Sequence, residues 1–137
     1  MKRIIYALGV IAFIIALVFI GFGNGKSKTV KEGGILSVND IQADPSSFKG
    51  IITVTGIVAR MHPSDPKVFA MIETKEAMHC KEVDCAKFYL PVRYEGKMPQ
   101  VWDEVNITGS LAKQDGFILK ASRVDILRHL NFGGRRQ

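Results

Sequence analysis

Cys80 and Cys85, separated by four residues, are the only cysteines in the 137-residue sequence. Such a pair can form a structural disulfide, which stabilises a fold by on the order of 2 kcal/mol when the closed loop is this small. With His79 beside them, the two thiols could instead belong to a metal site, although no fourth ligand follows at zinc-like spacing. Redox pairs usually have the tighter C-x-x-C spacing, so the sequence favours a disulfide.

His129 is the second residue with chemical potential. Neutral imidazole is a good axial ligand for haem iron, and Leu130 and Phe132 could offer apolar surface to the macrocycle. The alternative is a solvated histidine in a flexible basic tail over residues 129–137. Charge-assisted donors for haem propionates would come from the C-terminal cluster of Arg128, Arg135 and Arg136.

Aromatic residues form the third group. Phe69 and Tyr89 fall in neighbouring predicted strands and would form a base-stacking surface if both pointed outward. The net charge of +6 is modest and dispersed, so nucleic acid is not the expected partner, and these rings serve equally well as core or as a protein-binding face.

Catalysis has no recognisable motif in this chain. No serine, histidine or cysteine sits in a nucleophile motif, the carboxylates are scattered, and no glycine-rich phosphate loop is present. We therefore expect a binding protein rather than an enzyme.

Alternating apolar and polar residues predict the elements that position these groups. Five strands are predicted, with their first core residues at Ile52, Val68, Phe88, Val105 and Phe117. Many short strands of this kind predict a mainly β domain over residues 35–128, built as a small closed or partly closed barrel.

Several local signals refine this barrel. Ser37 can cap a short helix that ends before Asp44-Pro45 and precedes the first strand. The first strand can bend at Gly56, and Pro91 predicts a free edge or a bulge in the third. Asp115-Gly116 predicts the hairpin turn before the last strand, whose apolar face changes near Ser122, as at a bulge.

The N-terminal segment predicts a membrane anchor. Residues 4–22 contain no charge and would reach about 28 Å as a helix, close to the roughly 30 Å of a hydrocarbon core. We expect an anchor over residues 1–25, a flexible tether over residues 26–34, and a C-terminal domain outside the cytoplasm because Lys2 and Arg3 precede the run. A cleaved signal peptide is the alternative.

Two resemblances extend this interpretation. Val38-x-x-Ile41-x-x-Asp44-Pro45-x-x-Phe48-x-Gly50, followed by Val54-x-Gly56-x-Val58, resembles the opening of exported bacterial OB-fold domains. That resemblance implies a five-stranded OB-fold barrel with a short helix packed on its first strand.

The second resemblance lies in the last third of the chain. The run Val92-Arg93-Tyr94-Glu95-Gly96-x-Met98-Pro99, with Glu104, Gly109, Leu111 and Asp115-Gly116-Phe117 after it, resembles the periplasmic haem chaperone CcmE of cytochrome c maturation. This family has an N-terminal anchor in the inner membrane and an OB barrel in the periplasm.

The CcmE resemblance implies a role for the C-terminal segment. His129 stands where the family has its haem-binding histidine, and Gly133 stands where the family has a tyrosine. It therefore implies noncovalent haem handling through His129 and Phe132 in cytochrome c assembly. The alternative is a cofactor-free module of the envelope that binds another protein.

Overall fold

The computed structural model describes residues 34–132. The predicted anchor over residues 4–22, and all of the predicted tether except residue 34, lie outside this range. Among the described residues, no helix is both long and apolar enough to cross a membrane. The elements in chain order are β1 (Ile35–Ser37), α2 (Val38–Ala43), η1 (Pro45–Ser47), β2 (Ile51–Met61), β3 (Val68–Ile72), α3 (Thr74–Cys80), η2 (Val83–Cys85), β4 (Leu90–Arg93), β5 (Asp103–Lys113) and β6 (Phe117–His129).

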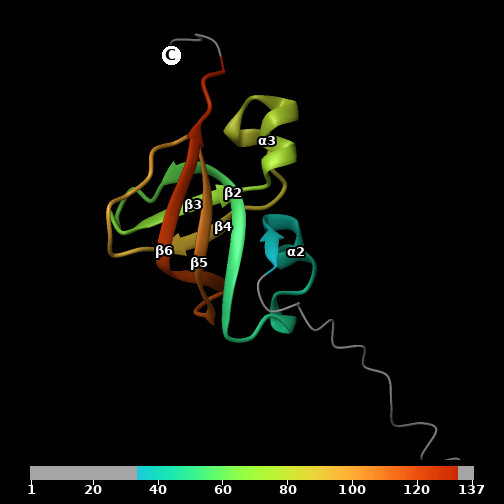
Figure 1. Cartoon of the computed structure of the whole chain (residues 1–137), viewed down its shortest axis with the longest axis vertical. Helices are drawn as coiled ribbons and strands as arrows, with labels where there is room; N and C mark the ends of the chain where they lie inside the picture. The colour runs from blue at the N-terminus through green and yellow to red at the C-terminus, as the bar shows by residue number, and fades with distance from the viewer. Residues whose placement is uncertain (1–33, 133–137) are drawn as a thin grey trace, which may run out of the picture.

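Five strands close into a barrel (Figure 1). The sheet runs β2-β3-β4-β6-β5, and a second pairing between β2 and β5 closes it. All these contacts are antiparallel except the short parallel pairing of β4 with β6. The three-residue β1, which the sequence did not predict, adds in parallel to β2. A mainly β, five-stranded barrel with a short helix before it confirms the predicted fold class and is an OB-type domain.

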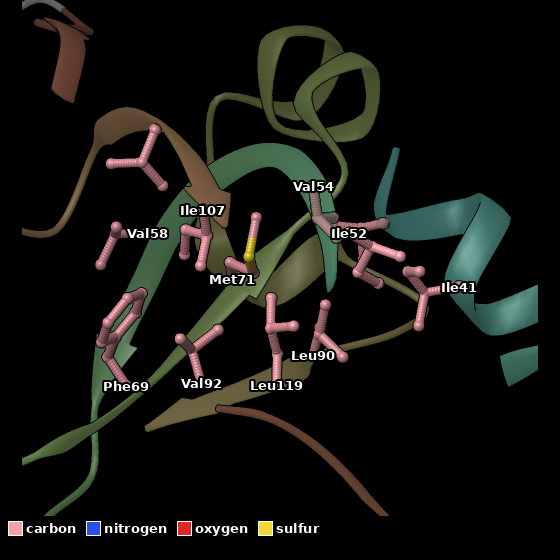
Figure 2. Packing of buried hydrophobic residues seen from close by; sticks show 12 residues of the cluster. Ile41, Ile52, Val54, Val58, Phe69, Met71, Leu90, Val92, Ile107 and Leu119 are labelled. Carbon is pink, nitrogen blue, oxygen red and sulfur yellow. The ribbon is translucent and has the colours of Figure 1, made fainter. Parts of the chain in front are cut away.

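The barrel interior is filled by one side of every strand (Figure 2). Residues at alternating positions are buried because successive side chains in a strand point to opposite faces. Phe69 is 1% exposed and points into this core, so the base-stacking surface that it would share with Tyr89 if both pointed outward is not formed, and its ring serves as core. The buried members of the cluster are Val38, Ile41, Ile52, Val54, Val58, Phe69, Met71, Leu90, Val92, Val105, Ile107 and Leu119.

Helix α2 packs against this core, as predicted. The hydroxyl oxygen of Ser37 accepts a hydrogen bond from the Asp40 backbone N–H, and the Asp40 carboxylate accepts one from the Ser37 N–H. Val38 and Ile41, three residues apart on the same face of the helix, are fully buried. The helix thus places its apolar face against the barrel core.

Irregular positions in the strands follow two of the three predictions. The β5–β6 register shifts between the Thr108–Arg123 and Gly109–Ala121 pairs, which leaves Ser122 as the predicted bulge. β4 pairs with β6 only from Val92 onward, which confirms a free edge at Pro91. The irregularity in β2 falls between Val58 and Arg60 rather than at Gly56.

Gly56 has a packing role instead. A Cβ atom there would lie 2.7 Å from the backbone oxygen of Ile72 and 2.9 Å from a methyl group of Val38. Only glycine allows β2 to approach both β3 and α2 this closely.

A second apolar cluster lies under α3 and η2. Its buried members are Ile57, Ala59, Ile72 and Ala77, and Trp102 and Leu130 pack against it. The sequence predicted only a polar connection between the second and third strands. Helix α3 was not predicted because most of its side chains are polar and it buries little besides Ala77, so it has no apolar face to recognise.

Candidate functional site

A groove of about 620 Å³ opens at the side of the barrel where β4 and β6 are not paired. Pairing of these strands begins at Val92–Leu119, so the segments before these two residues lie apart. Since Pro91 has no backbone N–H, it cannot extend the ladder toward β6. The groove is lined mainly by apolar side chains with a few polar ones, namely Ile41, Gln42, Pro45, His62, Asp65, Val68, Phe88, Tyr89, Pro91, Gln114, Asp115, Gly116, Phe117 and Ile118.

The groove occupies the ligand-binding side of an OB fold. OB domains bind their ligands on the face of the second and third barrel strands and on the loops that join strands one to two and four to five. In this chain those parts are β3, β4, the loop over residues 62–67 and the β5–β6 hairpin, and each contributes lining residues. The hairpin turns as predicted, with Asp115 and Gly116 at positive φ.

The loop over residues 62–67 forms an ordered wall of the groove. The Nδ1 atom of His62 accepts hydrogen bonds from the N–H groups of Ser64 and Asp65, at 3.3 and 3.1 Å. The Asp65 carboxylate accepts a hydrogen bond from the Lys67 N–H and forms a 2.9 Å ion pair with Arg93 of β4. These contacts hold the loop beside β4 and thereby fix this wall of the groove.

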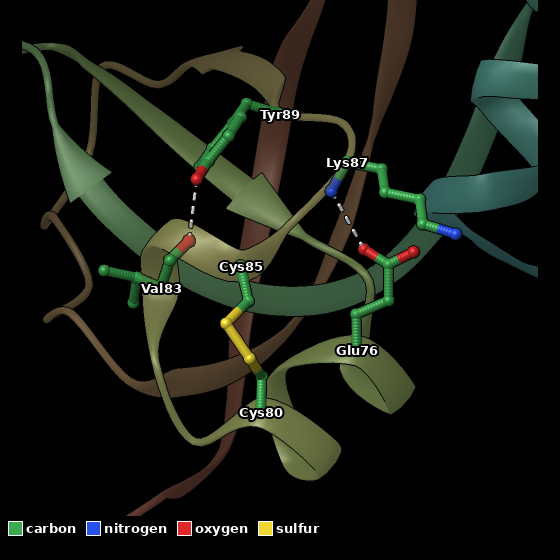
Figure 3. Close-up of a disulfide and its surroundings, with 6 residues drawn as sticks. All are labelled: Glu76, Cys80, Val83, Cys85, Lys87 and Tyr89. Atoms are coloured by element: carbon green, nitrogen blue, oxygen red, sulfur yellow. Dashed lines mark hydrogen bonds between the residues drawn. A yellow bond between two sulfur atoms is a disulfide. The ribbon is translucent and has the colours of Figure 1, made fainter.

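Tyr89 connects the groove to the disulfide region (Figure 3). Its hydroxyl donates to the backbone oxygen of Val83 at 2.7 Å, and the Arg60 guanidinium lies 4.0 Å from its ring centre. The disulfide Cys80–Cys85 joins the end of α3 to η2, with the two Cα atoms 6.3 Å apart. The predicted disulfide is therefore present. It links α3 to η2, which contains the Val83 oxygen that accepts the hydrogen bond from Tyr89.

The alternative metal site at the cysteines is not formed. Both sulfur atoms are used in the disulfide, which leaves His79 without them as co-ligands. No group of three or more His, Cys, Asp or Glu side chains within residues 34–132 is arranged to hold a metal ion.

His129 is the last residue of β6, at the opposite end of that strand from the groove residues Phe117 and Ile118. Its Nδ1 atom lies 2.8 Å from Oδ1 of Asp103, whose other carboxylate oxygen accepts the Gln100 N–H at 2.7 Å. A carboxylate can only accept, so Nδ1 donates, and in the neutral imidazole Nε2 then carries the free lone pair. The His129 side chain is 43% exposed and that of Asp103 is 6% exposed.

The residues around His129 are largely engaged in packing. Phe132 packs edge-on against Trp102, with ring centres 4.9 Å apart, and Leu130 packs on the second cluster. Arg128 forms an ion pair with Glu104 at 2.5 Å. Arg135 and Arg136 lie outside the described residues.

The groove was not predicted from the sequence. Sequence patterns predicted both the turn over residues 62–67 and the Asp115-Gly116 hairpin, but they did not indicate that the two loops lie on one side of the barrel. The OB topology could have indicated the groove, since OB folds use these two loops together in ligand binding.

Comparisons with known proteins add little to this geometry. No protein-family model matches the chain, and no curated protein matches it significantly. One similar solved structure is described as that of the hypothetical protein ygiW from E. coli, with 12% identity over 71% of this chain and 94% of that one, and a TM-score of 0.49. The assignment to the OB class rests on the strand order and closure of the barrel.

Proposed function

We propose that this chain is a membrane-anchored OB-fold binding module of the bacterial envelope. Residues 4–22 would hold it in the inner membrane, with the barrel in the periplasm. The Cys80–Cys85 disulfide supports this location, because disulfides persist in oxidising compartments and are rare in the cytoplasm.

The groove beside Pro91 is the observation that carries the binding function. It lies where OB domains bind ligands, its lining is mostly apolar, and a hydrogen-bonded loop fixes one wall. Such a surface suits an extended apolar segment of another envelope protein. The lining residues His62 and Asp65 would form polar contacts with it. In this function the chain needs no cofactor.

Site-specific photocrosslinking in native cells tests this function. A photoreactive residue in place of Phe117 should give a discrete crosslinked product, whereas one at the exposed Arg123 on the outer sheet surface should not. An added Ile118→Arg change should abolish the product because it fills the groove. Equal products from both positions, or persistence of the product in the Arg variant, would refute the groove as the binding site.

Haem handling in cytochrome c assembly is a second candidate, favoured by the Asp103–His129 hydrogen bond. A carboxylate on Nδ1 fixes the tautomer and the orientation of the imidazole ring, as it does for many metal-binding histidines. Nε2 of His129 would thus be the atom that holds haem iron, and the bound haem would be the group to be delivered. Phe132 and Trp102 would offer apolar contact, and Asp103 would hold the histidine in place.

A haemin titration followed by visible absorbance tests this candidate. The chain from residue 26 onward keeps every buried residue of both clusters, so we expect it to fold. Saturable binding should weaken strongly in His129→Ala and remain in His62→Ala, since His62 lies in the groove. Equal binding by both variants would place any haem elsewhere and remove His129 from the proposal.

A further inference from the structure

Ile51 and Ile35 are the two most exposed large apolar side chains among residues 34–132, at 78% and 59%. β1 runs parallel to β2 with Ile35 opposite Thr53, so Ile35 and Ile51 point from the same face of the sheet. Their positions are diagonal neighbours across two strands, close enough for large side chains to touch the same partner. No packing role within the described barrel explains either side chain.

Three lysines lie at the same end of the barrel as these two isoleucines. Ser110 pairs with Ile51 on one side and with Lys120 on the other, which puts Lys120 on the same face two strands away. Lys113 ends β5 three residues beyond Ser110, so it belongs to the other face of that strand but to the same end of the barrel, and Lys49 lies two residues before Ile51. All three lysines are exposed, and none forms an ion pair with another described residue. The acidic residues near this end along the chain are Asp115 in the hairpin, and Asp40 and Asp44, which accept hydrogen bonds from Ser37 and Ser47.

The chain that leads to the predicted anchor enters the barrel at this same end. β1 is the first described element, and only the twelve residues 23–34 separate Ile35 from the uncharged run that ends at Phe22. Even fully extended, twelve residues span at most about 40 Å. The same segment carries Lys26, Lys28 and Lys31 against the single acid Glu32.

We propose that the end of the barrel bearing Ile35, Ile51 and the three lysines docks on the surface of an anionic lipid bilayer. Exposed isoleucines would enter the interface, and the three lysines would meet lipid phosphates and acidic headgroups. This inference rests on the membrane anchoring proposed above. It orients the barrel with His129 and the disulfide region away from the lipid, because these lie at the far ends of β5 and β6.

Fluorescence of a label on the full-length chain in lipid nanodiscs tests the orientation. An environment-sensitive NBD dye is attached to a cysteine introduced as Ile51→Cys, while the native disulfide remains oxidised. The matched control is Leu127→Cys, since Leu127 is 52% exposed and belongs to the other end of β6. With one chain per disc, we expect a blue shift of emission at position 51 but not at position 127, larger with anionic than with zwitterionic lipid.

Each other outcome has a separate meaning. The shift at position 51 should shrink when Lys49, Lys113 and Lys120 are all changed to Gln, and also at high salt, which screens exposed charges. Water-like emission at position 51 in anchored protein would refute docking while leaving the anchor intact. Failure of the chain to enter nanodiscs would refute the anchor itself. A shift seen only with several chains per disc would identify a second copy as the occupant and overturn the lipid proposal.

Discussion

Removing the Cys80–Cys85 disulfide should lower the stability of the barrel without unfolding it. The bond closes a loop between residues only five apart, for which the chain-entropy relation gives on the order of 2 kcal/mol. Serine at both positions should carry little further cost, because Cys85 is exposed and Cys80 is only partly buried. The hydrogen bonds from Tyr89 to Val83 and from the Lys87 N–H to Glu76 should still hold α3 and η2 in place.

The only tryptophan, Trp102, provides the assay because it packs on the cluster that α3 covers. Urea unfolding of the full-length chain in a non-ionic detergent, followed by its fluorescence, should show a lower midpoint with an unchanged slope in the double serine variant. For a domain of this size we expect a decrease in melting temperature of about 10 °C. A reductant should shift the wild type to the same midpoint and leave the variant unchanged.

An unaltered midpoint in the double variant would refute the stabilising role of the bond. Ready alkylation of Cys80 and Cys85 in the native protein without a reductant would refute the disulfide itself, and with it one support for a periplasmic location.

Three substitutions test the packing with the same urea assay. Gly56→Ala should cost about 1–3 kcal/mol of unfolding free energy, because its Cβ would lie 2.7 Å from the Ile72 backbone oxygen, which cannot move freely; a neutral result would mean that β2 and β3 are further apart. Phe69→Ala should cost about 3–5 kcal/mol by leaving a cavity in the barrel, and a loss below 1 kcal/mol would instead fit an outward ring. Ser37→Ala should cost about 1 kcal/mol by removing the cap on the Asp40 N–H, whereas an unchanged midpoint would argue against the capping box. As a control for all three, Ser110→Ala on the exposed surface should change the free energy by less than about 0.5 kcal/mol.

Local features of the barrel were predictable because each depends on neighbours in the chain. Ser37 and Asp40 are three residues apart, and their reciprocal hydrogen bonds start α2 regardless of what it packs on. The change of apolar face around Ser122 is visible in the order of residues, since a bulge shifts the alternation by one. The close pair Cys80 and Cys85 could likewise be joined from spacing alone, and the structure confirms the disulfide.

The sequence left a feature undecided, or indicated the wrong role for it, where segments distant in the sequence come into contact. Phe69 and Tyr89 alternate with apolar neighbours on both sides, so the pattern does not say which face of β3 is internal. Barrel closure decides it, because β2 pairs with both β3 and β5 and leaves only one concave side to fill. A bend at Gly56 is the wrong interpretation for a similar reason, because its lack of a side chain allows close contact with Val38 and Ile72.

The sequence by itself determined the kind of chain this is: an uncharged N-terminal run, a small β barrel, a helix before it and a disulfide within it. These follow from composition and from interactions between near neighbours. The tertiary structure alone decided where the groove lies and how His129 is held. The groove exists because β4 and β6 separate before Val92, and Asp103 reaches His129 across the β5–β6 register. Both depend on strand pairing between segments more than twenty residues apart, which local sequence patterns do not encode.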